Sequence, residues 1–215
     1  MAVARSGEEG LRTLEAIADE VRACIRCRLH TTRAHAVPGE GAAPAEVLLV
    51  GEAPGRDEDA SGRPFVGRAG RILDAALDAA HLPRESVFIT NLVKCRPPGN
   101  RRPKRDEWAA CRPYLMGQIA AVQPRAIVTL GATALRGLMG PRHELKADRG
   151  TFLRLGEVPV LATYHPAAVL YNRRLEAVLR RDLRKVARTL ARPLPPGEAR
   201  AATGRRPSPD RRAKR

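Results

Sequence analysis

Four cysteines are the residues of this chain that are best suited to hold a metal. Cys24 and Cys27 form a C-x-x-C pair, whereas Cys95 and Cys111 stand alone with fifteen residues between them. Thiols in a reducing compartment are not expected to form disulfides. One close pair and two single cysteines fit a four-thiolate site better than a redox pair or scattered buried thiols. Zinc and a [4Fe-4S] cluster both accept four thiolates, and the spacing does not separate them.

Three polar residues with different chemistry follow the ends of predicted strands. Glu52 offers a carboxylate, Asn91 an amide and His165 an imidazole, and each comes at or just after the end of an apolar run. In open α/β sheets, ligands bind beyond the carboxyl ends of the strands. One polar residue at such a place is ordinary, but three with different capabilities predict a shared pocket.

The loops around these residues have simple interpretations of their own. The segment 51–55, GEAPG, matches neither G-x-G-x-x-G nor a phosphate-binding P-loop, so by itself it indicates a tight turn with a solvated Glu52. His165 before Pro166 is typical of a turn that leads into a helix. Phe65 would by default be a core residue, but its polar, glycine-rich frame predicts a ring held at a loop.

Strands and helices alternate along the chain and would position these residues. Short apolar runs predict strands buried in a sheet, at 47–50, 87–90, 126–130, 151–155 and 158–163. Helical spacing predicts helices from a capping box at Ser6 and Glu9 to Cys24, and at 69–80, 106–122, 131–139 and 170–191. Residues 28–45 and 94–105 are expected to be irregular. Alternation of this kind predicts an α/β fold with a parallel sheet covered on both faces.

The charge of the chain favours a polyanionic partner. Its 39 Lys and Arg against 23 Asp and Glu give a net charge of +16, while aromatic residues make up 3%. Nucleic acid is the simplest partner, although an arginine-rich chain gains solubility from the same charge. No apolar run could span a bilayer and the first residues are no secretory signal, so we expect a cytoplasmic protein. Residues 1–192 are expected to form one domain, and 193–215 a disordered basic tail.

Six features in order resemble the family 4 uracil-DNA glycosylases, the iron–sulfur class of the uracil-DNA glycosylase superfamily. They are CIRC at 24–27, LLVGEAPGRDED at 48–59, GRPFVGRAGRILD at 62–74, FITNLVKCRPPGNRRP at 88–103, Cys111, and TYHPAAVL at 163–170. The resemblance spans about residues 10–190. It implies a three-layer α/β/α sandwich around a short parallel sheet. It also implies a structural [4Fe-4S] cluster on the four cysteines, and hydrolysis of the bond between uracil and deoxyribose that leaves an abasic site in DNA.

The resemblance also implies roles for the residues of the pocket. A uracil flipped out of the DNA would stack on Phe65 and hydrogen-bond through its edge to Asn91. His165 would donate to the oxyanion that develops on uracil O2, and Glu52 would position or activate water. Glu58 would lie near the C5 edge and help to exclude the methyl group of thymine. The remaining pocket would be lined by the backbone of Gly51, Ala53, Pro54 and Gly55.

Contacts with uracil-containing DNA, single- or double-stranded, are expected outside the pocket. Val169 or Leu170 would fill the gap that the flipped base leaves in the stack. Phosphates would be bound by a basic loop and by the start of the last helix, through Arg96, Arg101, Arg102, Lys104, Arg105, Arg173 and Arg174. The protein is expected to act as a monomer, without a membrane.

One departure and two alternatives accompany this prediction. A related class carries a histidine that traps the abasic sugar covalently, but the loop 99–105 contains none, so turnover is expected. A non-enzymatic nucleic-acid-binding protein with a zinc or iron–sulfur module would explain the charge and the cysteines. A glycosylase for other deaminated bases would use the same fold, since pocket shape decides between the bases.

Overall fold

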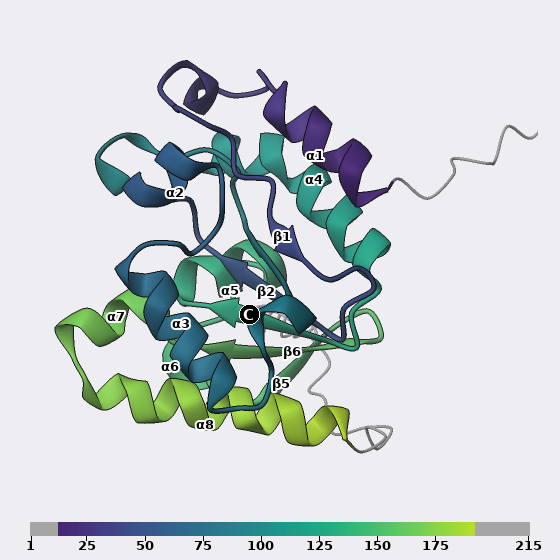
Figure 1. The fold of residues 1–215 in the computed structure, drawn as a ribbon, viewed down its shortest axis with the longest axis vertical. Helices are drawn as coiled ribbons and strands as arrows, with labels where there is room; N and C mark the ends of the chain where they lie inside the picture. The colour runs from purple at the N-terminus through teal and green to yellow at the C-terminus, as the bar shows by residue number, and fades with distance from the viewer. Residues whose placement is uncertain (1–12, 192–215) are drawn as a thin grey trace, which may run out of the picture.

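A six-stranded sheet with the strand order β1-β3-β2-β4-β6-β5 forms the centre of the computed structural model, which describes residues 13–191 (Figure 1). The strands are β1 (Glu40–Gly41), β2 (Val47–Gly51), β3 (Phe88–Asn91), β4 (Ala126–Leu130), β5 (Phe152–Leu155) and β6 (Val158–Thr163). The four inner strands are parallel, as predicted. The two edge strands β1 and β5 pair antiparallel, which makes the sheet mixed rather than wholly parallel.

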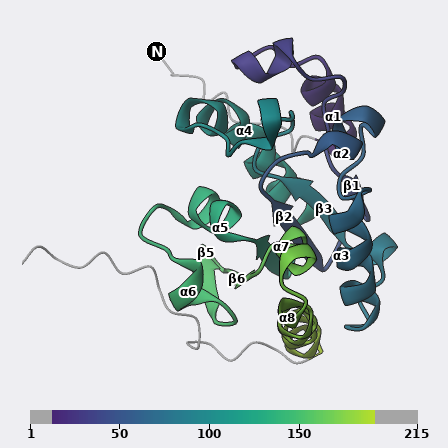
Figure 2. The same cartoon turned by 90° about the vertical axis from the view of Figure 1, so that its left-hand side faces the viewer.

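Helices cover both faces of the sheet and complete the predicted three layers. On one face lie α3 (Arg68–Asp78) and α8 (Arg174–Leu190), and on the other α4 (Arg105–Val122) and α5 (Ala132–Met139), as Figure 2 shows. Side chains alternate along a strand, so Leu49 packs under α3 and α8 while Leu48 packs under α4 and α5. Continuous apolar runs are therefore the sequence pattern of these strands, because both faces are buried.

The first described helix, α1 (Leu14–Arg22), packs against α4 outside the main layers. Its cap is Thr13, whose hydroxyl accepts a hydrogen bond from the Ala16 N–H at 3.1 Å. Ile17 and Val21 face a separate small core that includes the cysteines. The capping box expected at Ser6 and Glu9 and the tail expected at 193–215 lie outside the described residues. Among residues 13–191, no helix is long and apolar enough to cross a membrane.

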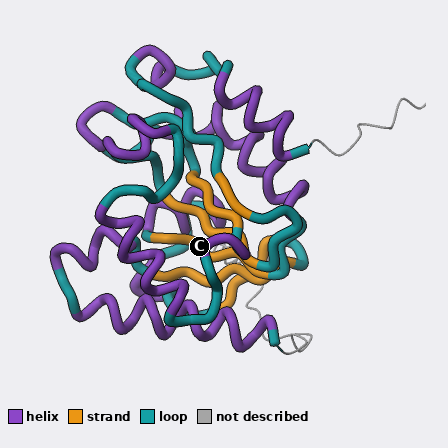
Figure 3. The backbone as a smooth tube through the Cα atoms, viewed as in Figure 1, coloured by secondary structure: helices purple, strands orange, loops and turns teal. Residues whose placement is uncertain are grey.

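The helix expected over 170–191 is instead two helices, and the chain turns between them (Figure 3). The helix α7 (Pro166–Tyr171) has Asn172 as its C-cap, and α8 begins after Arg173. The Asn172 side chain accepts a hydrogen bond from the Arg174 N–H at 3.1 Å. Periodicity missed this break because apolar residues continue across it.

Two short helices and three single turns also lie where loops were expected. The helices α2 (Arg56–Ser61) and α6 (Leu145–Asp148) are too short and polar to show a helical period. The single 3₁₀ turns are η1 (Arg28–Thr31), η2 (Arg84–Ser86) and η3 (Pro98–Asn100).

Candidate active site and cysteine cavity

The three strand-end residues converge on one cavity at the carboxyl edge of the sheet. Glu52 follows β2, Asn91 ends β3, and His165 begins the turn into α7 after β6. With Phe65 they line a space of about 320 Å³, within the range of small-molecule sites. The other residues around it are Ala53, Pro54, Gly55, Glu58, Ala69, Pro97, Asn100, Arg101 and Ala167.

Asn91 presents an unsatisfied hydrogen-bond acceptor at this cavity. Its Oδ1 atom is buried and has no hydrogen-bond partner, which is costly unless a ligand supplies a donor. Gly51 lies beside Asn91 in the parallel register. A Cβ atom on Gly51 would lie 2.2 Å from Asn91 Oδ1 and 2.7 Å from Phe65 Cζ, so glycine is required for this approach.

Phe65 is held in a backbone conformation that side chains rarely adopt. Its φ is +52°, in the left-handed region, and its ring centroid lies 5.6 Å from that of His165. The Arg84 guanidinium donates hydrogen bonds to the carbonyls of Pro64 (2.6 Å) and Phe65 (3.3 Å). A Cβ atom on Gly70 would meet the Phe65 carbonyl oxygen at 1.8 Å, so α3 can approach only through this glycine. The loop therefore fixes the ring beside the cavity.

Glu58 connects the two loops that form the cavity. Its carboxylate accepts hydrogen bonds of 3.0 Å from the backbone N–H groups of Gly55, Val66 and Gly67. Both carboxylate oxygens are thereby occupied by the protein itself. Glu58 lines the cavity, and its hydrogen bonds connect the loop at Gly55 to the loop that follows Phe65.

The hydrogen bonding of His165 determines which of its nitrogens carries the proton. Its Nδ1 accepts a hydrogen bond from the Ala167 N–H at 3.1 Å, at the start of α7. Burial lowers the pKa of His165 to about 4, although the Glu58 carboxylate acts in the opposite direction. The imidazole is therefore neutral near pH 7, with its proton on Nε2. This tautomer provides an uncharged N–H donor.

The residues of the predicted basic loop divide into two groups. Arg102, Lys104 and Arg105 are exposed, as expected for phosphate contacts. Arg96 is half-buried and donates to Asn100 Oδ1 at 2.7 Å. Arg101 lines the cavity itself and is paired with Glu107. The sequence analysis did not single out Glu107. Acidic residues are common in the first turn of a helix, so its position there did not predict burial or a functional role.

The candidates for filling the gap in the DNA stack need one correction. Val169 is only 4% exposed, because it packs on the inner side of α7, so it cannot be the inserting residue. Leu170 is 40% exposed, and its neighbour Tyr171, which the sequence analysis did not propose, is 91% exposed. The exposure of Tyr171 follows from the tertiary structure, and its sequence position after Leu170 carries no signal for it. Arg173 and Arg174 follow and are exposed.

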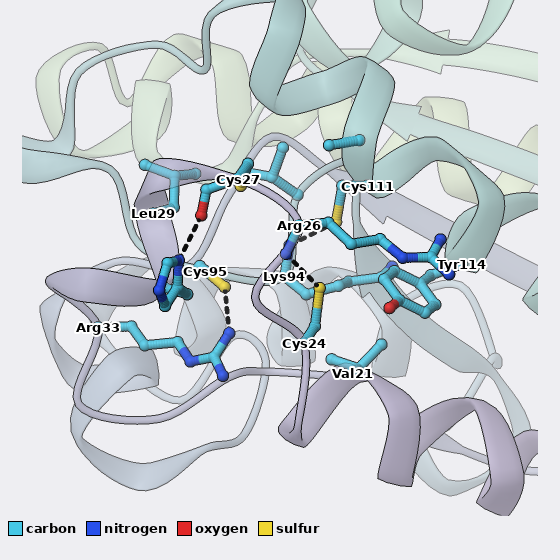
Figure 4. A pocket seen from close by; sticks show the side chains of 13 residues that line it. Val21, Cys24, Arg26, Cys27, Leu29, Arg33, Lys94, Cys95, Cys111 and Tyr114 are labelled. Carbon is cyan, nitrogen blue, oxygen red and sulfur yellow. Dashed lines mark hydrogen bonds between the residues drawn. The ribbon is translucent and has the colours of Figure 1, made fainter.

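The four cysteines surround a second cavity (Figure 4). Cys24 and Cys27 come from the segment after α1, Cys95 from the loop after β3, and Cys111 from α4. Burial raises the pKa of the Cys27, Cys95 and Cys111 thiols, that of Cys111 to about 11. Hydrogen-bond donors point at three of the sulfurs: Arg33 Nη1 lies 3.1 Å from Cys95 Sγ, the Lys94 N–H 3.3 Å from Cys111 Sγ and the Arg26 N–H 3.5 Å from Cys24 Sγ. Such donors stabilise thiolates.

The four sulfurs form one set of candidate ligands around this cavity. Within residues 13–191, no three side chains of His, Cys, Asp or Glu converge as they would around a single metal ion. Zinc would bring its ligand sulfurs within roughly 4 Å of one another, since each Zn–S bond is about 2.3 Å long. An iron–sulfur cluster binds each cysteine through a different iron and separates the ligands further. The four donors are all sulfur and all lie on one cavity, which is the donor set that either group accepts.

The comparisons with known proteins agree with this fold and site. A family model described as the uracil DNA glycosylase superfamily matches residues 38–190. A type-4 uracil-DNA glycosylase of Saccharolobus solfataricus is 47% identical over 188 residues, which cover 83% of this chain and 87% of that protein. One of Thermotoga maritima is 42% identical over 176 residues, covering 80% and 92%. The chain belongs to the uracil-DNA glycosylase superfamily and, within it, to the type-4 group.

Proposed function

We propose that this protein removes uracil from DNA by hydrolysing the bond between the base and deoxyribose. The observation that carries the proposal is the unpartnered, buried Asn91 Oδ1 at a cavity beside the Phe65 ring. Uracil N3–H can donate to this oxygen while uracil O4 accepts from the same amide. Cytosine presents the opposite pattern, so its binding would leave buried polar groups unsatisfied.

In the proposed reaction, His165 acts on the uracil base and Glu52 acts at the deoxyribose. The C1′–N1 bond breaks with its electron pair remaining on uracil, and His165 Nε2–H donates a hydrogen bond to the O2 atom that becomes negative. A neutral donor suffices there, because it is preorganised in a buried site. Glu52 positions a water whose oxygen bonds to C1′, and accepts the proton that this water loses. The products are free uracil and an abasic site.

The substrate is uracil-containing DNA, with the base flipped out of a duplex or already accessible in a single strand. Arg102, Lys104 and Arg105 bind phosphates on one side of the cavity, and Arg173 and Arg174 on the other. Leu170 fills the gap in a duplex stack, with Tyr171 beside it. We propose that the protein acts as a monomer. Relatives occur in archaea and bacteria, so we propose nucleoid DNA in the cytoplasm as its site of action.

Release of free uracil is the direct test of this function. The purified protein should release uracil from single-stranded and duplex oligonucleotides at low salt, and should turn over many times because no histidine is present in 99–105 to trap the sugar. Chromatography of the released base measures this. Matched oligonucleotides with hypoxanthine or xanthine serve as the comparison. Binding without any base release would favour the non-enzymatic alternative, and faster release of another base would favour a different deaminated substrate.

We propose that the four cysteines hold a [4Fe-4S] cluster with a structural role. The cluster would join three parts of the chain that are far apart in the sequence: the segment after α1, the loop after β3, and α4. Cys24, Cys27, Cys95 and Cys111 would each supply one thiolate.

Anaerobically purified protein is therefore expected to be brown, with broad absorbance near ~400 nm and about four irons per chain. Removing iron with a chelator should bleach the absorbance and lower the melting temperature, because three segments lose their common attachment. Absorption spectra, iron analysis and thermal melts measure this. Colourless protein with stoichiometric zinc would contradict the cluster.

A further inference from the structure

Glu107 is a buried acidic residue to which the reaction above gives no task. It lies in the first turn of α4 and its side chain is 0% exposed. Burying a carboxylate is costly unless charged partners compensate for the lost hydration. Cys111 lies four positions further along the helix, so both side chains lie on one face of it.

Arg101 is the main partner of this carboxylate. Its Nη2 lies 2.6 Å from Glu107 Oε1 and its Nη1 2.8 Å from Oε2, which is a two-point ion pair. The Lys104 N–H donates to Oε2 at 2.8 Å. Hydrogen bonds from Arg101 lower the pKa of Glu107, and the carboxylate in turn raises the pKa of Arg101, so both groups stay charged. Two bonds from a planar group fix the orientation of the guanidinium.

The orientation leaves donors of Arg101 available at the cavity. The second interaction of Nη1 is with the Arg102 carbonyl at 3.0 Å. A guanidinium has five N–H groups, so the Nε–H and one N–H of Nη2 have no partner among the described residues. Arg101 is 33% exposed and is the one Lys or Arg among the residues that line the cavity with Glu52 and Asn91. Its free edge is the side by which arginine binds a phosphate through two oxygens.

We propose that Arg101 binds the phosphate of the flipped nucleotide and that Glu107 is the positioning residue that holds it there. The proposal rests on the uracil-DNA glycosylase function above. A flipped nucleotide brings at least one negative phosphate close to a cavity that already contains the carboxylates of Glu52 and Glu58. Without a cation at this place, the phosphate would enter against like charge. The exposed arginines of the same loop lie outside the cavity and bind flanking phosphates.

The Glu107 carboxylate also lies near the segment that carries Cys24 and Cys27. Arg28 directly follows Cys27, and its guanidinium lies 2.6 Å from Asp106 Oδ2 and 3.8 Å from Glu107 Oε1. A cluster that orders Cys27 and Cys111 would therefore also order both sides of Glu107, and through it Arg101.

The test compares Glu107→Gln with Glu46→Gln, the same change at an exposed glutamate that pairs with Arg125 and does not line the cavity. Glu107→Gln is expected to raise KM for uracil-DNA about tenfold with kcat within about twofold, because a phosphate carries the same charge before and after the reaction. Glu46→Gln should leave both constants unchanged. Absorbance near ~400 nm and iron content verify that each variant retains its cluster.

Binding to an uncleavable 2′-fluoro-uridine oligonucleotide separates the flipped nucleotide from the flanking DNA. Glu107→Gln and Arg101→Ala should each lower the slope of log affinity against log salt by about one, the loss of one phosphate contact. The slope on the same oligonucleotide with thymine should not change. The double variant should bind no more weakly than Arg101→Ala, since both act on one contact.

Two results would overturn the proposal while leaving the proposed function intact: a Glu107→Gln enzyme with wild-type KM and salt slope, or a double variant whose losses add. Should Glu107→Gln fail to fold, Arg101→Ala decides by the same slopes, because its side chain is partly exposed. A wild-type protein that releases no uracil would instead refute the function itself.

Discussion

Replacing Asn91 by alanine is expected to lower kcat/KM for uracil release by about 10²–10³-fold, since each buried group of the base left without a partner costs ~1–3 kcal/mol. The amide both accepts from N3–H and donates to O4, so two hydrogen bonds are lost together. Its Oδ1 has no partner within the described protein, and the loss should therefore fall on substrate binding and catalysis rather than on folding. Steady-state kinetics on a single-stranded uracil oligonucleotide, with thermal melts alongside, measure both.

Arg102→Ala is the matched control for this prediction. Arg102 is exposed on the basic loop and does not line the cavity, so its loss should weaken DNA binding a few-fold and lower the salt slope. Both variants should retain absorbance near ~400 nm. Equal losses of kcat in the two variants, with DNA binding intact in both, would contradict the role of Asn91 as the group that recognises the base.

Replacing His165 by alanine is expected to lower kcat by about 10²–10³-fold, the usual effect of losing one oxyanion donor. KM should change little, because the charge on uracil O2 develops only in the transition state. Removing His165 also removes a ring beside Phe65, so binding of a uracil-containing oligonucleotide must be measured separately.

The pH dependence of the wild-type protein tests the protonation state of His165. Burial lowers the pKa of this residue to about 4 from its ordinary 6.5, so the imidazole remains neutral as the pH falls through 6.5 and gains a proton only near 4. In that window the unfolded chain binds a proton that the folded chain does not, so stability falls with falling pH. ¹⁵N NMR should show the Nε2–H tautomer down to about pH 5. A His165 resonance that titrates near 6.5 would contradict the neutral donor.

Much of the sheet could be predicted because its strands are buried on both faces. The runs at 47–50 and 126–130 are continuous and apolar, and such short runs are typical of strands that are buried on both faces of a sheet. The edge strand β1 has only two residues, Glu40 and Gly41, and carries no such pattern. The break between α7 and α8 was also missed, since it comprises only Asn172 and Arg173 and has neither a proline nor a glycine to mark it.

The site was predictable where single residues carry the chemistry. Glu52, Asn91 and His165 stand at the ends of strands, and parallel strands bring their carboxyl ends together. Burial, however, depends on what packs from elsewhere in the chain. Val169 and Leu170 are equally apolar neighbours, and only the packing of α7 on α3 and α8 shows that one is inside and the other outside.

The sequence by itself determined the four parallel inner strands and the place of three chemically distinct residues at strand ends, and it predicted the four cysteines as one ligand set. These features depend on residue type and on local spacing, which are present in the chain before it folds. The tertiary structure alone decided the tautomer of His165, the left-handed backbone of Phe65 and the pairing of Arg101 with Glu107. Each of these follows from backbone geometry, packing or burial that exists only once distant segments meet, and burial sets the energy of every charge and hydrogen bond at the site.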